Sequence, residues 1–261
     1  MRIPVTRTGP PHRSDDEFVS FREVRERFGF YGVKVGRWVT DDEQTRAAEY
    51  FYDALCDLML ILKVPETVIS LRSSLALHYG TGGRPGVAAH YSPQEKAFAL
   101  AKNAGPGSIA HEWFHAFDHY IAQQAFSDLP TSSFASPEWL NQKATPVAHP
   151  LNDLLFECFR AVILDSSGNA PSDLFTASAK ADRASGILYY SRPEEMTARA
   201  FEAFVQDATI KNNFLVKGTK KSREAELGLY PAGAQRQRIN ASFTRYFHSL
   251  GHALSSKIVS G

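Results

Sequence analysis

Two histidines four residues apart enclose a glutamate in the segment HEWFH, residues 111–115. On an α-helix His111 and His115 lie about one turn apart on the same face, so both can ligate one metal ion. Glu112 lies about 100° around the helix from His111 and flanks that face without joining the ligands. Zinc lowers the pKa of a bound water from about 15.7 to about 7, and a neighbouring carboxylate can take its proton as the hydroxide attacks a carbonyl. The spacing therefore predicts a catalytic Zn²⁺ site with Glu112 as general base.

The flanks of this motif favour a buried helix over a solvated one. Apolar residues back the metal face, and glycines at 105 and 107 permit a close turn from a strand into the helix. The apolar positions are Ile109, Ala110, Phe114, Phe117 and Ile121. The alternative reading is three polar residues on an exposed helix face, and these flanks make it the weaker one.

A catalytic zinc site usually has three protein ligands and one open position. The extended motif that supplies a third histidine would need glycine at 118 and histidine at 121, where this chain has Asp118 and Ile121. The third ligand is therefore expected to be a carboxylate on another element. The best candidate is the predicted helix SRPEEMTARAFEAFV, residues 191–205.

That helix offers three glutamates. Ser191 and Glu194 have the spacing of a capping box, which turns Glu194 back toward the helix start. From the residues alone Glu195 is the first candidate for the ligand and Glu202 the second. Both lie on one polar stripe, which either lines a cleft or is ordinary exposed surface. The same stripe contains Arg199 and Gln206.

The helices and strands expected around these residues indicate an α+β fold, in which a few strands are followed by many helices. A capping box at Thr40 and Glu43 begins a long helix that Pro65 stops. Strands are expected over 68–79 and 97–101, with a glycine-rich turn at 80–86. Further helices are expected over 108–125, 151–164, 193–207 and 233–249. Residues 1–19 are expected to form a flexible tail, and residues 20–261 a single domain.

The composition excludes several classes of function. The chain has 29 Lys and Arg against 28 Asp and Glu, so it lacks the basic field of a general nucleic-acid binder. Cys56 and Cys158 lie in apolar helical patterns and match no zinc-finger spacing. The apolar runs are too short to span a bilayer, and the N-terminus has no signal-peptide core. A cytoplasmic protein with no membrane partner is the expectation, and the oligomeric state is left open.

The segments HEWFHAFDHY (111–120) and YYSRPEEMTARAFE (189–202) resemble the zincin-like domain of large polyvalent proteins of phages and plasmids. They resemble still more closely the CLCA_X family of stand-alone bacterial proteins, named for a metallohydrolase domain of calcium-activated chloride channel regulators. The resemblance extends to 28–39 and 75–83 and covers roughly residues 20 to 245. It implies a zincin-like fold, with a small sheet packed on several helices including the HExxH helix. It implies no particular substrate.

The lethal-factor type of toxin metalloprotease is more distantly similar. Its motif HEFGHAVDDY precedes a helix EFFAEAF, which corresponds to residues 195–201 here. The similarity implies that Glu195 is the zinc ligand, as in enzymes of the gluzincin type, and that Arg199 replaces the family's second glutamate. The toxins also have a tyrosine shortly before the ligand that can donate to the oxyanion, a role implied here for Tyr190, or for Tyr189 in its place.

Three further positions have expected roles near the metal. Asp118, one turn beyond His115, is expected to orient a ligand by a hydrogen bond, and His119 is a possible pocket residue. The strand 97–101 precedes the metal helix, as does the zincin edge strand on which a peptide can add as an extra strand.

These expectations favour a zinc endopeptidase that acts on a protein or peptide substrate. One alternative keeps the zinc but hydrolyses another amide or an ester. The other is a non-catalytic zinc-binding interaction module of mobile-element origin.

Overall fold

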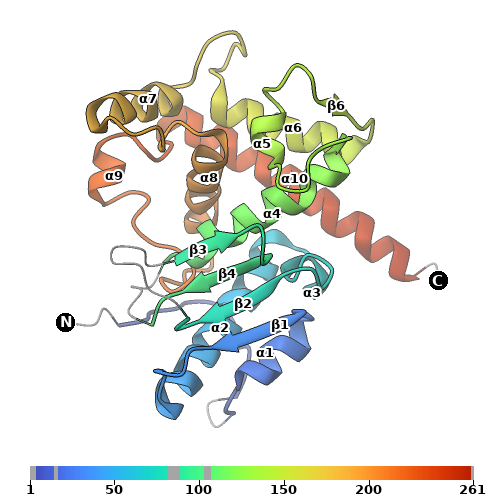
Figure 1. Ribbon diagram of the computed structural model, residues 1–261, viewed down its shortest axis with the longest axis vertical. Helices are drawn as coiled ribbons and strands as arrows, with labels where there is room; N and C mark the ends of the chain where they lie inside the picture. Colours follow the sequence, from blue (N-terminus) through green and yellow to red (C-terminus); the bar gives the residue numbers. More distant parts are fainter. Residues whose placement is uncertain (1–3, 15–16, 82–88, 103–106, 260–261) are drawn as a thin grey trace. The chain divides into compact units, whose positions relative to one another are not determined.

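The structure is a computed structural model that describes residues 4–14, 17–81, 89–102 and 107–259 (Figure 1). The chain divides into two compact units. Unit 1 comprises Met1–Ala116 and Ala208–Lys217, and unit 2 comprises Phe117–Asp207 and Gly218–Gly261. The boundary at residue 116 falls inside helix α4, Ile109–Ala125, so this one helix contributes residues to both units. The fold is α+β, as the sequence predicts.

Unit 1 contains the sheet. Its strands lie in the order β1-β2-β4-β3, with β1, β2 and β4 mutually parallel and β3 antiparallel to β4 (Figure 1). The strands are β1 Gly32–Val35, β2 Ala76–Tyr79, β3 Ala89–Ser92 and β4 Ala97–Leu100. The helices of this unit, besides the start of α4, are α1 Phe21–Phe28, α2 Asp41–Leu62 and α3 Glu66–Ile69.

Helix α2 confirms the prediction made from its caps. Thr40 Oγ1 accepts from the backbone N–H of Glu43, and the Glu43 carboxylate accepts from the N–H of Thr40. The helix ends where Lys63 takes a left-handed conformation, two residues before Pro65. Its buried face carries Phe51, whose ring lies among several other aromatic rings in the core of unit 1. These are Phe21, Tyr79, Phe98 and Phe214.

Two strand predictions need correction. The first half of the expected strand 68–79 is helix α3 followed by a turn in which Leu71, Arg72 and Ser73 have φ of 53°, 56° and 61°. A strand cannot contain three successive left-handed residues, so only Ala76–Tyr79 is extended. The expected edge strand 97–101 is β4, which pairs with β2 on one side and β3 on the other. Among the described strands, the edge of this side of the sheet is therefore β3, which the sequence analysis missed.

The N-terminal segment contacts the rest of unit 1. Arg7 Nε and Nη2 donate to the two carboxylate oxygens of Asp57 at 2.7 and 2.6 Å. Arg7 also forms a β-bridge with Asn212, and the N–H of Thr8 donates to the carbonyl of Lys211 at 2.7 Å. Residues of the expected flexible tail thus have defined partners on α2 and on segment 208–217.

Unit 2 is predominantly helical. Its core forms where α10 packs against α6 and α8, and α10 extends ten residues beyond the predicted end at 249. Its helices are α5 Ala135–Glu138, α6 Pro150–Ile163, α7 Asp173–Ser185, α8 Pro193–Asp207, α9 Arg223–Glu226 and α10 Gly233–Val259. Two short strands, β5 Phe126–Ser127 and β6 Thr145–Pro146, pair with each other. Within the described ranges, no helix has both the length and the apolar composition needed to cross a bilayer.

Candidate metal centre

The start of α4 and the turn before it are fixed by three hydrogen bonds within unit 1. The N–H groups of Gly107 and Ala110 donate to the carbonyls of Phe214 and Leu215 at 3.0 and 3.1 Å. Trp113 Nε1 donates to the carbonyl of Ile69 at 2.9 Å. Gly107 has a φ of 112°, and a Cβ there would lie 2.5 Å from Lys217 Cγ, so this turn requires glycine.

The apolar backing predicted for the motif is present, except that Ile121 is only half-buried. Ile109, Ala110 and Phe114 are fully buried, and the opposite face of the helix carries the histidines. His115 is 8% exposed and His111 is half-buried. The helix therefore presents both imidazoles from a rigid, packed support rather than from an exposed face.

Helices α4 and α8 pack against the same ring of α10 within unit 2. The ring of Phe247 lies 5.4 Å from that of Phe117 on α4 and 5.7 Å from that of Phe201 on α8. Phe117 follows His115 by two residues, and Phe201 lies less than two turns after Glu195. This aromatic cluster therefore packs the unit 2 part of α4 and helix α8 against α10.

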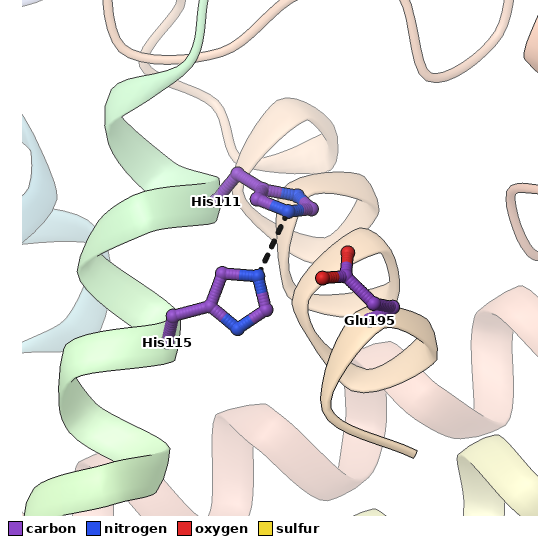
Figure 2. A group of neighbouring side chains, drawn as sticks. All are labelled: His111, His115 and Glu195. Atoms are coloured by element: carbon purple, nitrogen blue, oxygen red, sulfur yellow. Dashed lines mark hydrogen bonds between the residues drawn. The ribbon is translucent and has the colours of Figure 1, made fainter. Parts of the chain in front are cut away.

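The three predicted ligands come together. His111 Nε2 and His115 Nε2 are 3.0 Å apart, and one ligand atom from each of His111, His115 and Glu195 lies within 4.8 Å of the other two (Figure 2). Two nitrogens bound tetrahedrally at 2.0–2.1 Å from one zinc are separated by about 3.3 Å. Figure 2 shows both rings and the carboxylate directed toward a common point. The geometry thus makes this a possible metal-binding triad.

The donor set can be compared with the preferences of different metals. Two imidazole nitrogens and one carboxylate oxygen are the ligands of many catalytic zinc sites, while magnesium and calcium prefer oxygen donors alone. Glu195 is 8% exposed and Glu112 is 7% exposed, so the site lies largely out of bulk water. The residues present therefore fit zinc.

Comparison with known proteins gives one result, and it concerns the second half of the chain. Residues 181–254 match the family model of large polyvalent protein-associated domain 1. No curated protein and no solved structure matches the chain. The match supports a relationship with the large polyvalent proteins, and the zincin-like fold stays a prediction. We refer to residues 181–254 as the matched segment; it contains Glu195 but not the two histidines.

Within the matched segment, the polar stripe of α8 is buried rather than exposed. Arg199 and Glu202 are each 5% exposed. Tyr230 Oη donates to Glu202 Oε2 at 3.2 Å, and the N–H of Thr219 donates to Gln206 Oε1 at 2.8 Å. Burial, followed by the nearby Glu202 carboxylate, raises the pKa of Tyr230. Beyond Arg199, Glu202 and Gln206 of the stripe thus accept hydrogen bonds from the segment from Thr219 to Tyr230.

The capping box predicted at the start of α8 is wrong. Ser191 Oγ donates to Asp182 of α7, and Glu194 Oε1 pairs with Arg192 Nη2 at 2.6 Å. The structure instead fixes the start of α8 through Asp182, which the sequence analysis missed. Asp182 accepts from the backbone N–H groups of Tyr189, Tyr190 and Ser191 at 3.1, 2.7 and 2.8 Å.

The Asp182 carboxylate is stabilised in its charged form. Burial alone would raise the pKa of this carboxyl, but the hydrogen bonds from Ser191, Tyr190 and Tyr189 outweigh burial and leave the pKa below its ordinary value. Asp182 therefore stabilises the fold fully above the ordinary carboxyl pKa of about 4. This contribution is lost as the pH falls through the lowered native pKa.

Asp182→Asn is expected to lower the free energy of unfolding at pH 7 by about 2 kcal/mol, the usual magnitude for hydrogen bonds to a charged group. Urea unfolding at pH 7 and at pH values below 4 measures the effect, and the difference from the parent should shrink in acid. Asp173→Asn, at an exposed position in the first turn of the same helix, is the control and should cost less than about 1 kcal/mol. If both variants lose the same amount of unfolding free energy, the proposed stabilisation of the start of α8 by Asp182 is wrong.

Asp118 and His119 have structural contacts in unit 2. The Asp118 carboxylate accepts from Ser136 N at 2.9 Å and from Ser136 Oγ at 2.6 Å. His119 Nε2 lies 2.7 Å from the carbonyl of Thr131. Both residues thus attach segment 131–136 to α4. The hydrogen bond expected from Asp118 to a metal ligand stays a prediction.

Proposed function

We propose that this chain is a zinc-dependent hydrolase, a metalloendopeptidase of the gluzincin type that cleaves a protein or peptide substrate. The observation that carries the proposal is the convergence of ligand atoms from His111, His115 and Glu195 within 4.8 Å of one another. Because Glu112 directly follows His111 on the same helix, the proposed general base lies next to the two histidine ligands. A bound Zn²⁺ would supply Lewis-acid polarisation of water and of the substrate carbonyl.

The proton transfers of the proposed hydrolysis would be carried out by Glu112. Glu112 accepts a proton from the water whose oxygen attacks the scissile carbonyl carbon. When the C–N bond breaks, the same carboxyl group returns the proton to the departing amine nitrogen. The burial of Glu112 excludes bulk water that would compete for these transfers.

Tyr190 is the proposed donor to the carbonyl oxygen as that oxygen gains negative charge. Its ring centroid lies 5.6 Å from Arg199 Cζ, one turn along α8 from Glu195. Its backbone N–H is held by Asp182. Tyr189, which is 41% exposed and in edge contact with the Tyr190 ring, is the alternative donor. Separate Phe substitutions of the two tyrosines would distinguish them.

The sheet of unit 1 is the proposed binding site for an extended peptide substrate. Among the described strands, β3 pairs with β4 alone and is the last strand on that side of the sheet. A peptide that adds to such an edge is bound through its main chain, which suits an enzyme that accepts several sequences.

Glu112→Gln is expected to reduce peptide hydrolysis by about 100- to 10,000-fold, the range attributed to a general base, while zinc binding is retained. The experiment measures bound zinc in the parent and the variant and then cleavage of a diverse peptide library by each. Glu226→Gln, the same change at an exposed position of α9, is the matched control and should retain full activity. Parent and Glu112→Gln proteins with the same measurable activity would contradict the proposal.

A non-catalytic zinc-binding module is the second candidate. The family match includes α8 and most of α10 but not the HExxH helix, so the match itself gives no support for catalysis. Under this alternative, fully zinc-loaded parent protein would cleave no member of the library, and removal of zinc would destabilise the fold.

A further inference from the structure

Arg199 is a buried cation at the point where three segments of unit 2 meet. Its Nε donates to the carbonyl of Leu229 at 2.8 Å, and its Nη2 donates to Ser178 Oγ at 3.3 Å and to the carbonyl of Tyr190. Its guanidinium also lies over the Tyr190 ring. One side chain of α8 thus connects α7, the turn before α8 and the segment that precedes α10.

The turn of residues 189–191 is held from two sides. On one side Arg199 binds the Tyr190 carbonyl. On the other, Asp182 binds three successive N–H groups and the Ser191 hydroxyl. Ser178 and Asp182 are one turn apart on α7 and both are buried, so α7 presents one partner to Arg199 and one to the turn. We call Arg199, Asp182 and Ser178 the clamp.

The clamp lies directly next to the proposed zinc ligand. The turn of residues 189–191 ends two residues before Pro193, where α8 begins, and Glu195 is in the first turn of that helix. Side chains on a helix tilt toward its N-terminus, which directs Arg199 toward the turn that contains Glu195. Burial lowers the pKa of Arg199, and the largest opposing effect is the charge of Glu195, in agreement with this closeness.

We infer that Arg199 is a positioning residue of the candidate metal centre: through the clamp it fixes the start of α8, and with it Glu195 and Tyr190, in the ligand geometry. This inference rests on the proposed function. A planar guanidinium suits the task because its rigid fork holds several hydrogen bonds in fixed directions while its flat face stacks on an aromatic ring, whereas an ammonium is a compact point charge without that planar geometry. The arginine therefore ties the proposed metal ligand to α7 in this chain.

Arg199→Met is expected to weaken zinc binding by about 10- to 100-fold, the usual cost of removing a residue that supports a metal ligand. Arg199→Lys, which keeps the charge but not the fork, should give an intermediate loss. Zinc affinity is measured by chelator competition on each full-length variant. The visible absorption spectrum of the Co²⁺-saturated protein is the second readout, because it reports ligand geometry and is insensitive to general stability.

Arg183→Met is the matched control, since Arg183 is an exposed arginine of α7 next to Asp182. This variant should match the parent in both readouts. Circular dichroism of each metal-free protein establishes folding, and Arg199→Lys provides the test if Arg199→Met does not fold. Folded Arg199 variants with zinc affinity within threefold of the parent and an unchanged Co²⁺ spectrum would overturn the inference about Arg199 and leave the proposed function standing. A parent protein that binds no zinc would instead overturn the proposed function.

Discussion

Glu195→Gln is expected to weaken zinc binding by more than about 100-fold, because loss of a ligand should exceed the cost of losing a residue that only supports one. A neutral amide oxygen is a poor substitute for a carboxylate, and the substitution removes the only negative charge of the triad. Thermal unfolding with and without zinc gives an independent readout. Zinc at 100 times its Kd stabilises a protein by about 2.7 kcal/mol, and this increment should nearly vanish in the variant.

Glu202→Gln is the control for this substitution. Glu202 lies on the same stripe of the same helix, is buried to a similar extent, and was the second candidate for the ligand from the sequence. The structure places its carboxylate against Tyr230 instead. Zinc affinity should therefore change less than threefold. If Glu202→Gln abolishes zinc binding while Glu195→Gln retains it, the assignment of the third ligand is wrong.

The choice between these two glutamates shows what the sequence could predict about the site. Spacing on α4 identified His111, Glu112 and His115, because one helical turn determines their geometry. Periodicity on α8 placed Glu195 and Glu202 on one stripe with Glu195 as the first candidate, and the resemblance to the toxin family implied the same residue. The contact of Glu202 with Tyr230 could not be predicted, because Tyr230 is distant in sequence and comes close only through the packing of unit 2.

The sequence predicted part of the fold, as it predicted part of the candidate site. Helices with strong caps and long apolar faces, such as α2, follow from local interactions and were predicted within a residue or two. Strands β1 and β3 were missed because, unlike β2 and β4, they contain no buried residue and so lack the apolar run that marked those strands. Helix α7 was missed although Ser172 caps its start and Gly186 its end, so Asp182 and Ser178 were missed with it.

The turn at 71–73 shows why strand propensity alone gave a wrong prediction there. The sequence around it is rich in residues that favour strands, and local propensity therefore predicted a continuous strand. In the structure the serine side chains bond to the backbone: Ser70 Oγ accepts from Ser73 N at 3.2 Å, and Ser74 Oγ donates to the carbonyl of Leu71 at 2.7 Å. Such side-chain bonds compete with the strand and stabilise the turn.

Arg7→Met is expected to reduce the free energy of unfolding by about 3 kcal/mol, near the lower end of the cost of breaking a buried ion pair. Asp57 is fully buried, and Arg7 contacts both of its oxygens; the Arg7 side chain is 19% exposed, which moderates the loss. His12 Nε2 at 2.7 Å and Asn212 Nδ2 at 2.9 Å remain as partners of Asp57 in the variant. Urea unfolding followed by circular dichroism measures the difference.

The matched control is Arg22→Met, which breaks an ion pair with Glu26 in which the side chains are 84% and 59% exposed. An exposed pair of this kind contributes little to stability because solvent screens it, so this variant should unfold like the parent. Amide exchange should also accelerate at Thr8 and Asn213, whose N–H groups join the two segments, in the Arg7 variant alone. If residues 1–19 are instead the flexible tail that the composition predicts, Arg7→Met and Arg22→Met will have equally small effects, since a flexible segment cannot compensate a buried charge.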